Sequence, residues 1–122
     1  MDIFYLQGLS NLTSLYFSDN QVVDISCLQG LSNLKTLWFN RNQVSDISCL
    51  QGLGNLTNLN FSDNKIVDIS CLNGLSNLTV LDFRENPVFL HLPAPPQEKY
   101  PNTYQNRIEL WQYFVDNYVN KS

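Results

Sequence analysis

The chain has 122 residues, which is enough for one small domain and too few for two ordinary ones. Apolar residues make up 43% of it and charged residues 15%, a balance typical of a folded protein and not of a disordered one. Its net charge of -4 repels phosphate backbones and anionic lipid surfaces, so we expect neither nucleic acid nor a membrane as a partner.

The N-terminus lacks the features of a targeting signal. Residues 1–12, MDIFYLQGLSNL, contain no basic segment followed by an apolar stretch. No run approaches the ~18 apolar residues that indicate a membrane span. We therefore expect a cytoplasmic protein, or an extracellular or cell-surface one if a leader has been removed from the chain.

The chain begins inside a repeated unit. Residues 1–6 align with residues 23–28 one period later, so a partial repeat over residues 1–5 precedes the first full copy. The first strand then has an unpaired edge, which usually invites association. Either the chain is a fragment of a longer repeat protein, or a second copy covers this edge in a homo-oligomer.

The unit occurs four times in succession, and its second copy reads LQGLSNLKTLWFNRNQVSDISC. The copies occupy residues 6–27, 28–49, 50–71 and 72–93. A fixed period of about 20–29 residues that carries L-x-x-L-x-L-x-x-N predicts a solenoid of leucine-rich repeats.

Each copy contains one short strand. In the second copy Leu37 and Phe39 alternate with Thr36, Trp38 and Asn40, which predicts a strand near residues 36–40 with one face inward. The equivalent strands centre on residues 15–17, 59–61 and 81–83. Because every copy runs the same way around the coil, we expect these strands to pair in parallel.

An asparagine follows each strand at the same place in the repeat. These residues are Asn20, Asn42, Asn64 and Asn86. An inward asparagine can both donate to and accept from backbone groups at a turn, so we interpret this column as structural. Gly30 and its equivalents in the other copies are expected to allow a tight backbone path on the return side.

This pattern resembles the bacterial internalin-type class of leucine-rich repeat. The match lies in the L-x-G-L-x-N-L-x-x-L-x-F-x-x-N-x-V/I frame and the D-I-S-x-L junctions, and it covers about residues 2–90. The resemblance implies an α/β right-handed solenoid, a horseshoe segment with short parallel strands on the concave face and 3₁₀ or irregular turns on the convex face. It also implies a binding role and no catalytic residues. In this chain Cys stands where many relatives place Pro, and Phe replaces the usual third Leu.

The end of the chain departs from the repeat after Pro87. Residues 94–122, which we assign to the same domain as the repeats of residues 1–93, form a Pro-rich connection and then a helix. Residues 107–119 have apolar side chains at helical spacing, and Asn106 with Glu109 fits a capping box. We expect this helix to cap the open end of the core; an exposed helix that docks into a partner is the alternative.

The outward positions of the strands vary while the frame around them hardly changes. Tyr16 and Trp38 are expected to point outward on adjacent strands, and such aromatic residues dominate protein interfaces. Arg41 lies between Asp19 and Asp63 one period away on either side, which predicts a surface ladder of charges. The predicted partner-binding residues are Tyr16, Trp38, Asn40, Arg41 and Asn60. Alternatively, the aromatic pair covers itself or packs against a second copy.

Three residue types suggest chemistry that other features argue against. Cys27, Cys49 and Cys71 form a column, but their odd number and spacing predict reduced thiols and not disulfides or a zinc site. The aspartate before each I-S-C is expected to cap a turn and not to bind calcium. His91 is the single histidine, and it lies in the irregular exit. We therefore predict no metal, no cofactor and no catalysis.

The sequence thus predicts a non-catalytic module that binds a protein partner through the concave face of the solenoid. The alternative is a structural role, either as a self-assembling segment or as a spacer of a longer repeat protein with no separate ligand.

Overall fold

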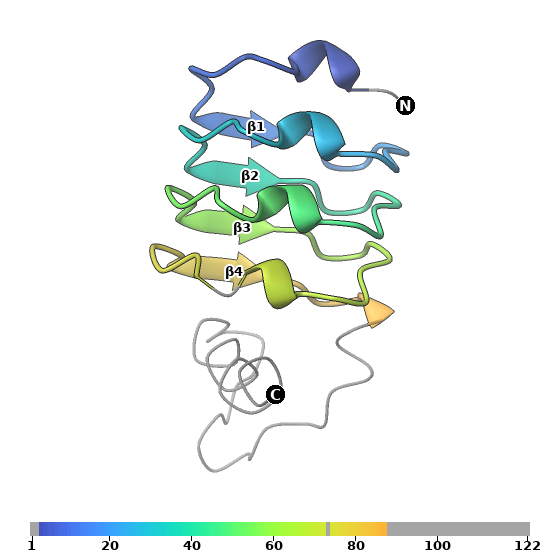
Figure 1. The fold of residues 1–122 in the computed structure, drawn as a ribbon. Helices are drawn as coiled ribbons and strands as arrows, with labels where there is room; N and C mark the ends of the chain where they lie inside the picture. The colour runs from blue at the N-terminus through green and yellow to red at the C-terminus, as the bar shows by residue number, and fades with distance from the viewer. Residues whose placement is uncertain (1–2, 73, 88–122) are drawn as a thin grey trace.

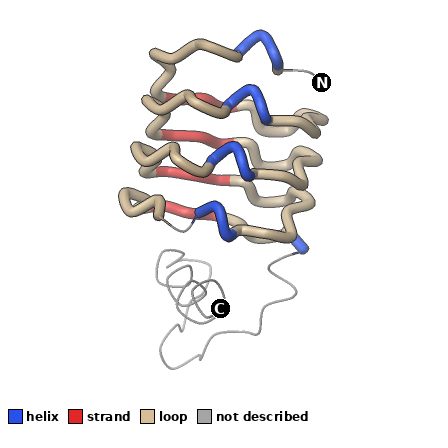
Figure 2. Tube along the Cα trace, in the orientation of Figure 1, coloured by secondary structure: helices blue, strands red, loops and turns tan. Residues whose placement is uncertain are grey.

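The structure is a computed structural model and describes residues 3–72 and 74–87. In these residues 3₁₀ turns alternate with three-residue strands. The turns are η1 (Phe4–Leu6), η2 (Ser26–Leu28), η3 (Ser48–Leu50) and η4 (Ser70–Leu72), and the strands are β1 (Ser14–Tyr16), β2 (Thr36–Trp38), β3 (Asn58–Asn60) and β4 (Val80–Asp82). The coils stack in chain order (Figure 1), and the strands form one column and the turns another (Figure 2).

The strands pair in parallel in the order β1-β2-β3-β4, as the sequence predicted. Leu37 pairs with Leu15 on one side and with Leu59 on the other. β2 has three residues and is shorter than the strand predicted near residues 36–40, because the chain turns at Arg41, whose φ is 57°. Phe39 still continues the ladder beyond β2, since its N–H donates to the Asn60 carbonyl at 2.8 Å.

The core is one column of inward side chains that runs through all four coils. Leu34, Leu37, Phe39, Val44 and Ile47 of the second copy are each at most 2% exposed, which confirms their predicted inward positions. The four phenylalanines that replace the third leucine stack on one another, with ring centroids 5.6, 5.8 and 6.4 Å apart. Each coil therefore buries its apolar side chains against its two neighbours.

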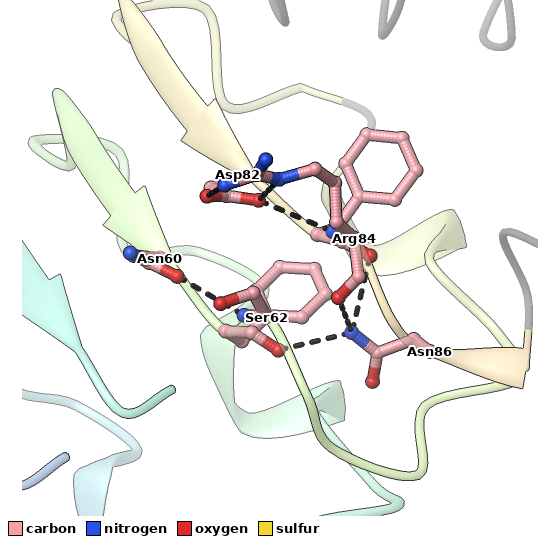
Figure 3. A network of polar contacts seen from close by, with 7 residues as sticks. Asn60, Ser62, Asp82, Arg84 and Asn86 are labelled. Atoms are coloured by element: carbon pink, nitrogen blue, oxygen red, sulfur yellow. Dashed lines mark hydrogen bonds and ion pairs between the residues drawn. The ribbon is translucent and has the colours of Figure 1, made fainter. Parts of the chain in front are cut away.

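The asparagine column, which we call the asparagine ladder, holds successive coils together. The Asn64 amide nitrogen donates to the Phe61 carbonyl of its own coil at 3.0 Å and to the Phe39 carbonyl of the preceding coil at 3.1 Å. Its oxygen accepts from the Val44 N–H at 3.0 Å. Asn86 repeats the arrangement against the Phe61 and Phe83 carbonyls (Figure 3). The structural role predicted for this column is confirmed.

The turn side is held by side chains of the D-I-S-C junction. The Asp46 carboxylate accepts from the Ser48 N–H at 2.9 Å, and this hydrogen bond lowers the pKa of Asp46. The Cys49 thiol donates to the Ile25 carbonyl of the preceding coil at 3.2 Å. Gly30 has a φ of 84°, a left-handed conformation that explains the glycine there. The predicted turn caps are observed.

The ends of the repeats are described only in part. Ile3, within the predicted partial repeat, is 2% exposed and belongs to the core. The Pro-rich connection, the capping helix over residues 107–119 and the boundary at residue 93 lie outside the described residues, so they stay predictions.

Candidate functional site

The outward side chains of the four strands form a continuous surface, which we call the strand face. Because side chains alternate along a strand, Leu37 points into the core while Thr36 and Trp38 point out of it. The first outward column is Ser14, Thr36, Asn58 and Val80, and the second is Tyr16, Trp38, Asn60 and Asp82.

An exposed aromatic pair occupies the N-terminal half of the strand face. Tyr16 is 59% exposed and Trp38 37% exposed, so both predicted anchors reach the surface. Their ring centroids lie 5.4 Å apart with an interplanar angle of 82°. This edge-to-face arrangement places the positive edge of one ring on the negative face of the other, and it is favoured over a face-to-face sandwich. The pair therefore has a fixed geometry and still presents exposed area.

Asn58 holds the indole from the opposite side. The Trp38 Nε1–H group donates to the Asn58 side-chain oxygen at 2.8 Å. Asn58 pairs in register with Thr36, so it lies diagonally across from Trp38 on the neighbouring strand. Diagonal neighbours on one face are within reach of a large aromatic side chain. The predicted contact residues did not include Asn58; this diagonal offset from Trp38 is the signal that could have identified it.

Two further asparagines flank the aromatic pair. Asn60 is the register partner of Trp38, and its side-chain oxygen accepts from the Ser62 N–H at 3.0 Å (Figure 3). Asn40 lies two residues beyond Trp38, and its oxygen accepts from the Ser18 hydroxyl at 2.5 Å. The structure thus brings four of the five predicted residues, Tyr16, Trp38, Asn40 and Asn60, onto one surface.

The fifth predicted residue, Arg41, forms only half of the expected charge ladder. Its guanidinium pairs with the Asp19 carboxylate at 3.2 Å, and both side chains are more than 60% exposed. Such an exposed pair stabilises the protein by less than about 1 kcal/mol. Within residues 3–72 and 74–87 Arg41 forms no ion pair with Asp63, so the predicted ladder from Asp19 through Arg41 to Asp63 is not continuous.

The C-terminal half of the strand face is mostly polar, with Val80 as its exposed apolar residue. Asp82 is 7% exposed because the Arg84 side chain covers it, with the Asp82 carboxylate accepting from Arg84 Nε at 3.0 Å and from its NH2 group at 2.8 Å (Figure 3). An open hollow of about 490 Å³ lies at the strand exits. It is lined by Asn40, Arg41, Ser62, Asp63, Arg84 and Glu85.

The cysteine column does not provide a reactive site. Burial, followed by nearby charge, raises the pKa of Cys49 to about 12 and that of Cys71 to about 11. Since the thiolate is the nucleophile and the metal ligand, these thiols are inert at neutral pH. In the part of the chain that the structure describes, no three His, Cys, Asp or Glu side chains gather closely enough to hold a metal ion. No helix found there has both the length and the apolarity that crossing a bilayer requires.

Comparison with known families identifies the repeats. A family pattern described as "Leucine Rich repeats (2 copies)" matches residues 10–52 and 54–90, more than half of the chain. The chain belongs to the leucine-rich repeat family. No curated protein matches this leucine-rich repeat protein.

Solved structures place this leucine-rich repeat protein in the internalin-type class. Internalin C2 of Listeria monocytogenes is 47% identical with a TM-score of 0.69, and the match covers 70% of this chain and 38% of that one. The internalin InlF of the same species is 40% identical with a TM-score of 0.69, over 70% of this chain and 25% of that one. The chain therefore spans less than half the length of either structure.

Proposed function

We propose that this leucine-rich repeat protein is a non-catalytic module that binds a protein partner through the strand face. The observation that carries the proposal is the exposed Tyr16–Trp38 pair, fixed by an edge-to-face contact and by the hydrogen bond to Asn58. Trp and Tyr are the residues most enriched among those that dominate binding energy at protein interfaces.

The fixed geometry of the pair supports this role. Immobilising a side chain with many rotamers on binding costs about 0.5–1.5 kcal/mol. Trp38 is already held between Tyr16 and Asn58, so little of this cost remains to be met when a partner packs on the indole. Trp38 lies on β2, which pairs with β1 on one side and with β3 on the other, so the indole stands on a rigid support.

Trp38→Ala tests the proposal. Random peptides displayed on phage are selected on the parent chain, and the selected peptides are then measured against Trp38→Ala and against Val67→Ala. Val67 is 61% exposed and lies outside the strands, so it is a control for the loss of an exposed apolar side chain. We expect Trp38→Ala to abolish binding and to keep the circular dichroism of the parent. Equal affinities of the parent and Trp38→Ala for every selected peptide would reject the strand face as the binding site.

A second candidate function is self-association through the N-terminal edge. Within the described residues β1 pairs with β2 alone. Leu15 of β1 is half-buried, whereas its equivalent Leu37 is fully buried, and Tyr5 and Leu9 are exposed near the same edge. An uncovered strand edge with apolar neighbours favours pairing with another chain.

The molar mass measured by light scattering over a concentration series tests this second candidate. A dimer that Tyr5→Ala and Leu9→Ser weaken would support it. A strict monomer would remove the self-assembling alternative and leave the role of a spacer in a longer protein.

The cytoplasmic location and the exclusion of nucleic acid and membranes stay predictions.

A further inference from the structure

Two amide groups beside the aromatic pair have fixed orientations. The Trp38 Nε1–H group can only donate, so the Asn58 atom 2.8 Å away from it has to be the side-chain oxygen. The Ser62 backbone N–H also only donates, which assigns the oxygen of Asn60 in the same way. The amide nitrogen of each side chain therefore lies on the other side of the amide, as Figure 3 shows for Asn60.

These amide nitrogens have no acceptor among residues 3–72 and 74–87. Neither Asn58 Nδ2 nor Asn60 Nδ2 donates a hydrogen bond there, although both side chains are only half-buried on the strand face. The Asn40 side-chain oxygen accepts from the Ser18 hydroxyl, and the Asn40 amide nitrogen likewise donates to no described residue. Each amide nitrogen carries two hydrogens. The surface around Trp38 thus offers hydrogen-bond donors that residues 3–72 and 74–87 do not use.

We propose that the strand face binds an extended segment of a protein partner through backbone carbonyl oxygens of that segment. The carbonyls accept hydrogen bonds from Asn58 and Asn60, and an apolar side chain of the same segment packs on Trp38. Backbone carbonyls accept hydrogen bonds, so they match the unused amide hydrogens of Asn58 and Asn60. This inference rests on the function proposed above and names the chemistry of its partner.

Two other ligands that carry acceptors match this surface less well. A sugar hydroxyl both donates and accepts, so its hydrogen would face amide nitrogens that cannot accept it. A segment rich in carboxylates would approach a chain with a net charge of -4. At the strand exits it would meet Asp63 and Glu85, while Arg41 and Arg84 are already paired with Asp19 and Asp82. A backbone carbonyl is neutral and carries no hydrogen of its own.

Asn58→Asp and Asn60→Asp are the variants that isolate the donors. Each keeps the oxygen that accepts from Trp38 or Ser62 and replaces the amide nitrogen by a second oxygen. The fold accommodates the change, because Asp82 occupies the position of Asn60 in the next repeat and accepts from the Arg84 N–H at 3.2 Å. Gln29→Glu is the matched control, since it makes the same chemical change at an exposed residue that follows η2.

The probes are the phage-selected peptides whose binding Trp38→Ala abolishes. We expect each Asn→Asp variant to weaken peptide binding roughly tenfold or more, because it removes a donor and turns a negative oxygen toward the peptide carbonyls. Gln29→Glu should stay within about twofold of the parent. The indole Nε1–H resonance of Trp38, measured by NMR without any peptide, should persist in Asn58→Asp, which shows that the indole keeps its acceptor.

The outcomes separate the two proposals. Parent-like or tighter binding by both Asn→Asp variants, together with loss of binding in Trp38→Ala, would overturn the carbonyl inference and leave the proposed function standing. A selection that yields no peptide dependent on Trp38 would overturn both. A glycan array tests for a carbohydrate ligand. If the parent binds a glycan and both Trp38→Ala and Asn58→Asp lose that binding, the ligand is a carbohydrate and this inference is overturned.

Discussion

Replacing Asn64 of the asparagine ladder by alanine removes hydrogen bonds of unequal importance. The Phe39 carbonyl also accepts from Asn42, and the Phe61 carbonyl also accepts from Asn86, so both keep one donor in the variant. The Val44 N–H, in contrast, loses the Asn64 oxygen that accepts from it at 3.0 Å. The main consequence of Asn64→Ala is therefore one unsatisfied N–H group in the interior.

The cost of this substitution follows from these contacts. Leaving a buried polar group unsatisfied costs about 1–3 kcal/mol, and each hydrogen bond lost from a group that keeps another partner costs on the order of 0.5–1 kcal/mol. We expect Asn64→Ala to lower the free energy of unfolding by about 2–5 kcal/mol. Asn20→Ala is the matched control, because the Asn20 nitrogen donates to the Phe17 and Ser18 carbonyls at the exposed end of the stack. Its expected cost is about 1 kcal/mol.

Urea unfolding followed by far-ultraviolet circular dichroism measures both variants against the parent. The slope of the transition should not change, because the surface exposed on unfolding stays nearly the same. Equal costs for Asn64→Ala and Asn20→Ala would refute the reasoning, since only the inner residue accepts from a backbone N–H of the preceding coil.

Three shorter predictions concern the thiols, the turn caps and the strand exits. Because burial raises the pKa of Cys49 to about 12 and that of Cys71 to about 11, labelling by Ellman's reagent at neutral pH should be on the order of 100-fold slower than in urea. The hydrogen bond from Ser48 lowers the pKa of Asp46 below 3.8, so it contributes stability above that pH which is lost as the pH falls through the folded-state pKa. The fall in the urea midpoint on acidification should be smaller in Asp46→Asn. Asp63 has a φ of 56°, so Asp63→Val should destabilise the fold by about 1–2 kcal/mol and Asp63→Gly should not.

Each of these three predictions would be contradicted by a specific result. Rapid labelling of the folded chain would show that the thiols are accessible as thiolates. An unchanged acid response in Asp46→Asn would remove the carboxylate as its source. Equal stability of the valine and glycine variants would contradict a left-handed backbone at the strand exit.

The sequence was sufficient for the repeat, the core and the asparagine ladder. These features depend on positions that recur in every copy, so Leu37 and Phe39 could be placed inward and Asn42 at the turn from the period alone. Parallel pairing followed from the same repetition. Periodicity could fix the fold because each coil meets an almost identical neighbour.

The candidate site was predictable only in part, because it depends on side chains that do not recur. The outward positions of Tyr16 and Trp38 followed from alternation, but their edge-to-face angle did not. The repeat register places Asn58 diagonally across from Trp38, but the indole rotamer that completes the hydrogen bond does not follow from the repeat. Arg41 had an aspartate one period away on either side, and its pairing with Asp19 was settled by side-chain conformation.

The hydrogen bonds between coils join residues 20 to 25 positions apart, so each coil bonds only to its immediate neighbours. Recombination that deletes residues 28–49 would therefore join two surviving units whose leucine, phenylalanine and asparagine columns still match. Tyr16 would then stand beside Asn60 in place of Trp38. Gain or loss of a whole unit can in this way produce a new outer surface on an unaltered interior, without any point mutation.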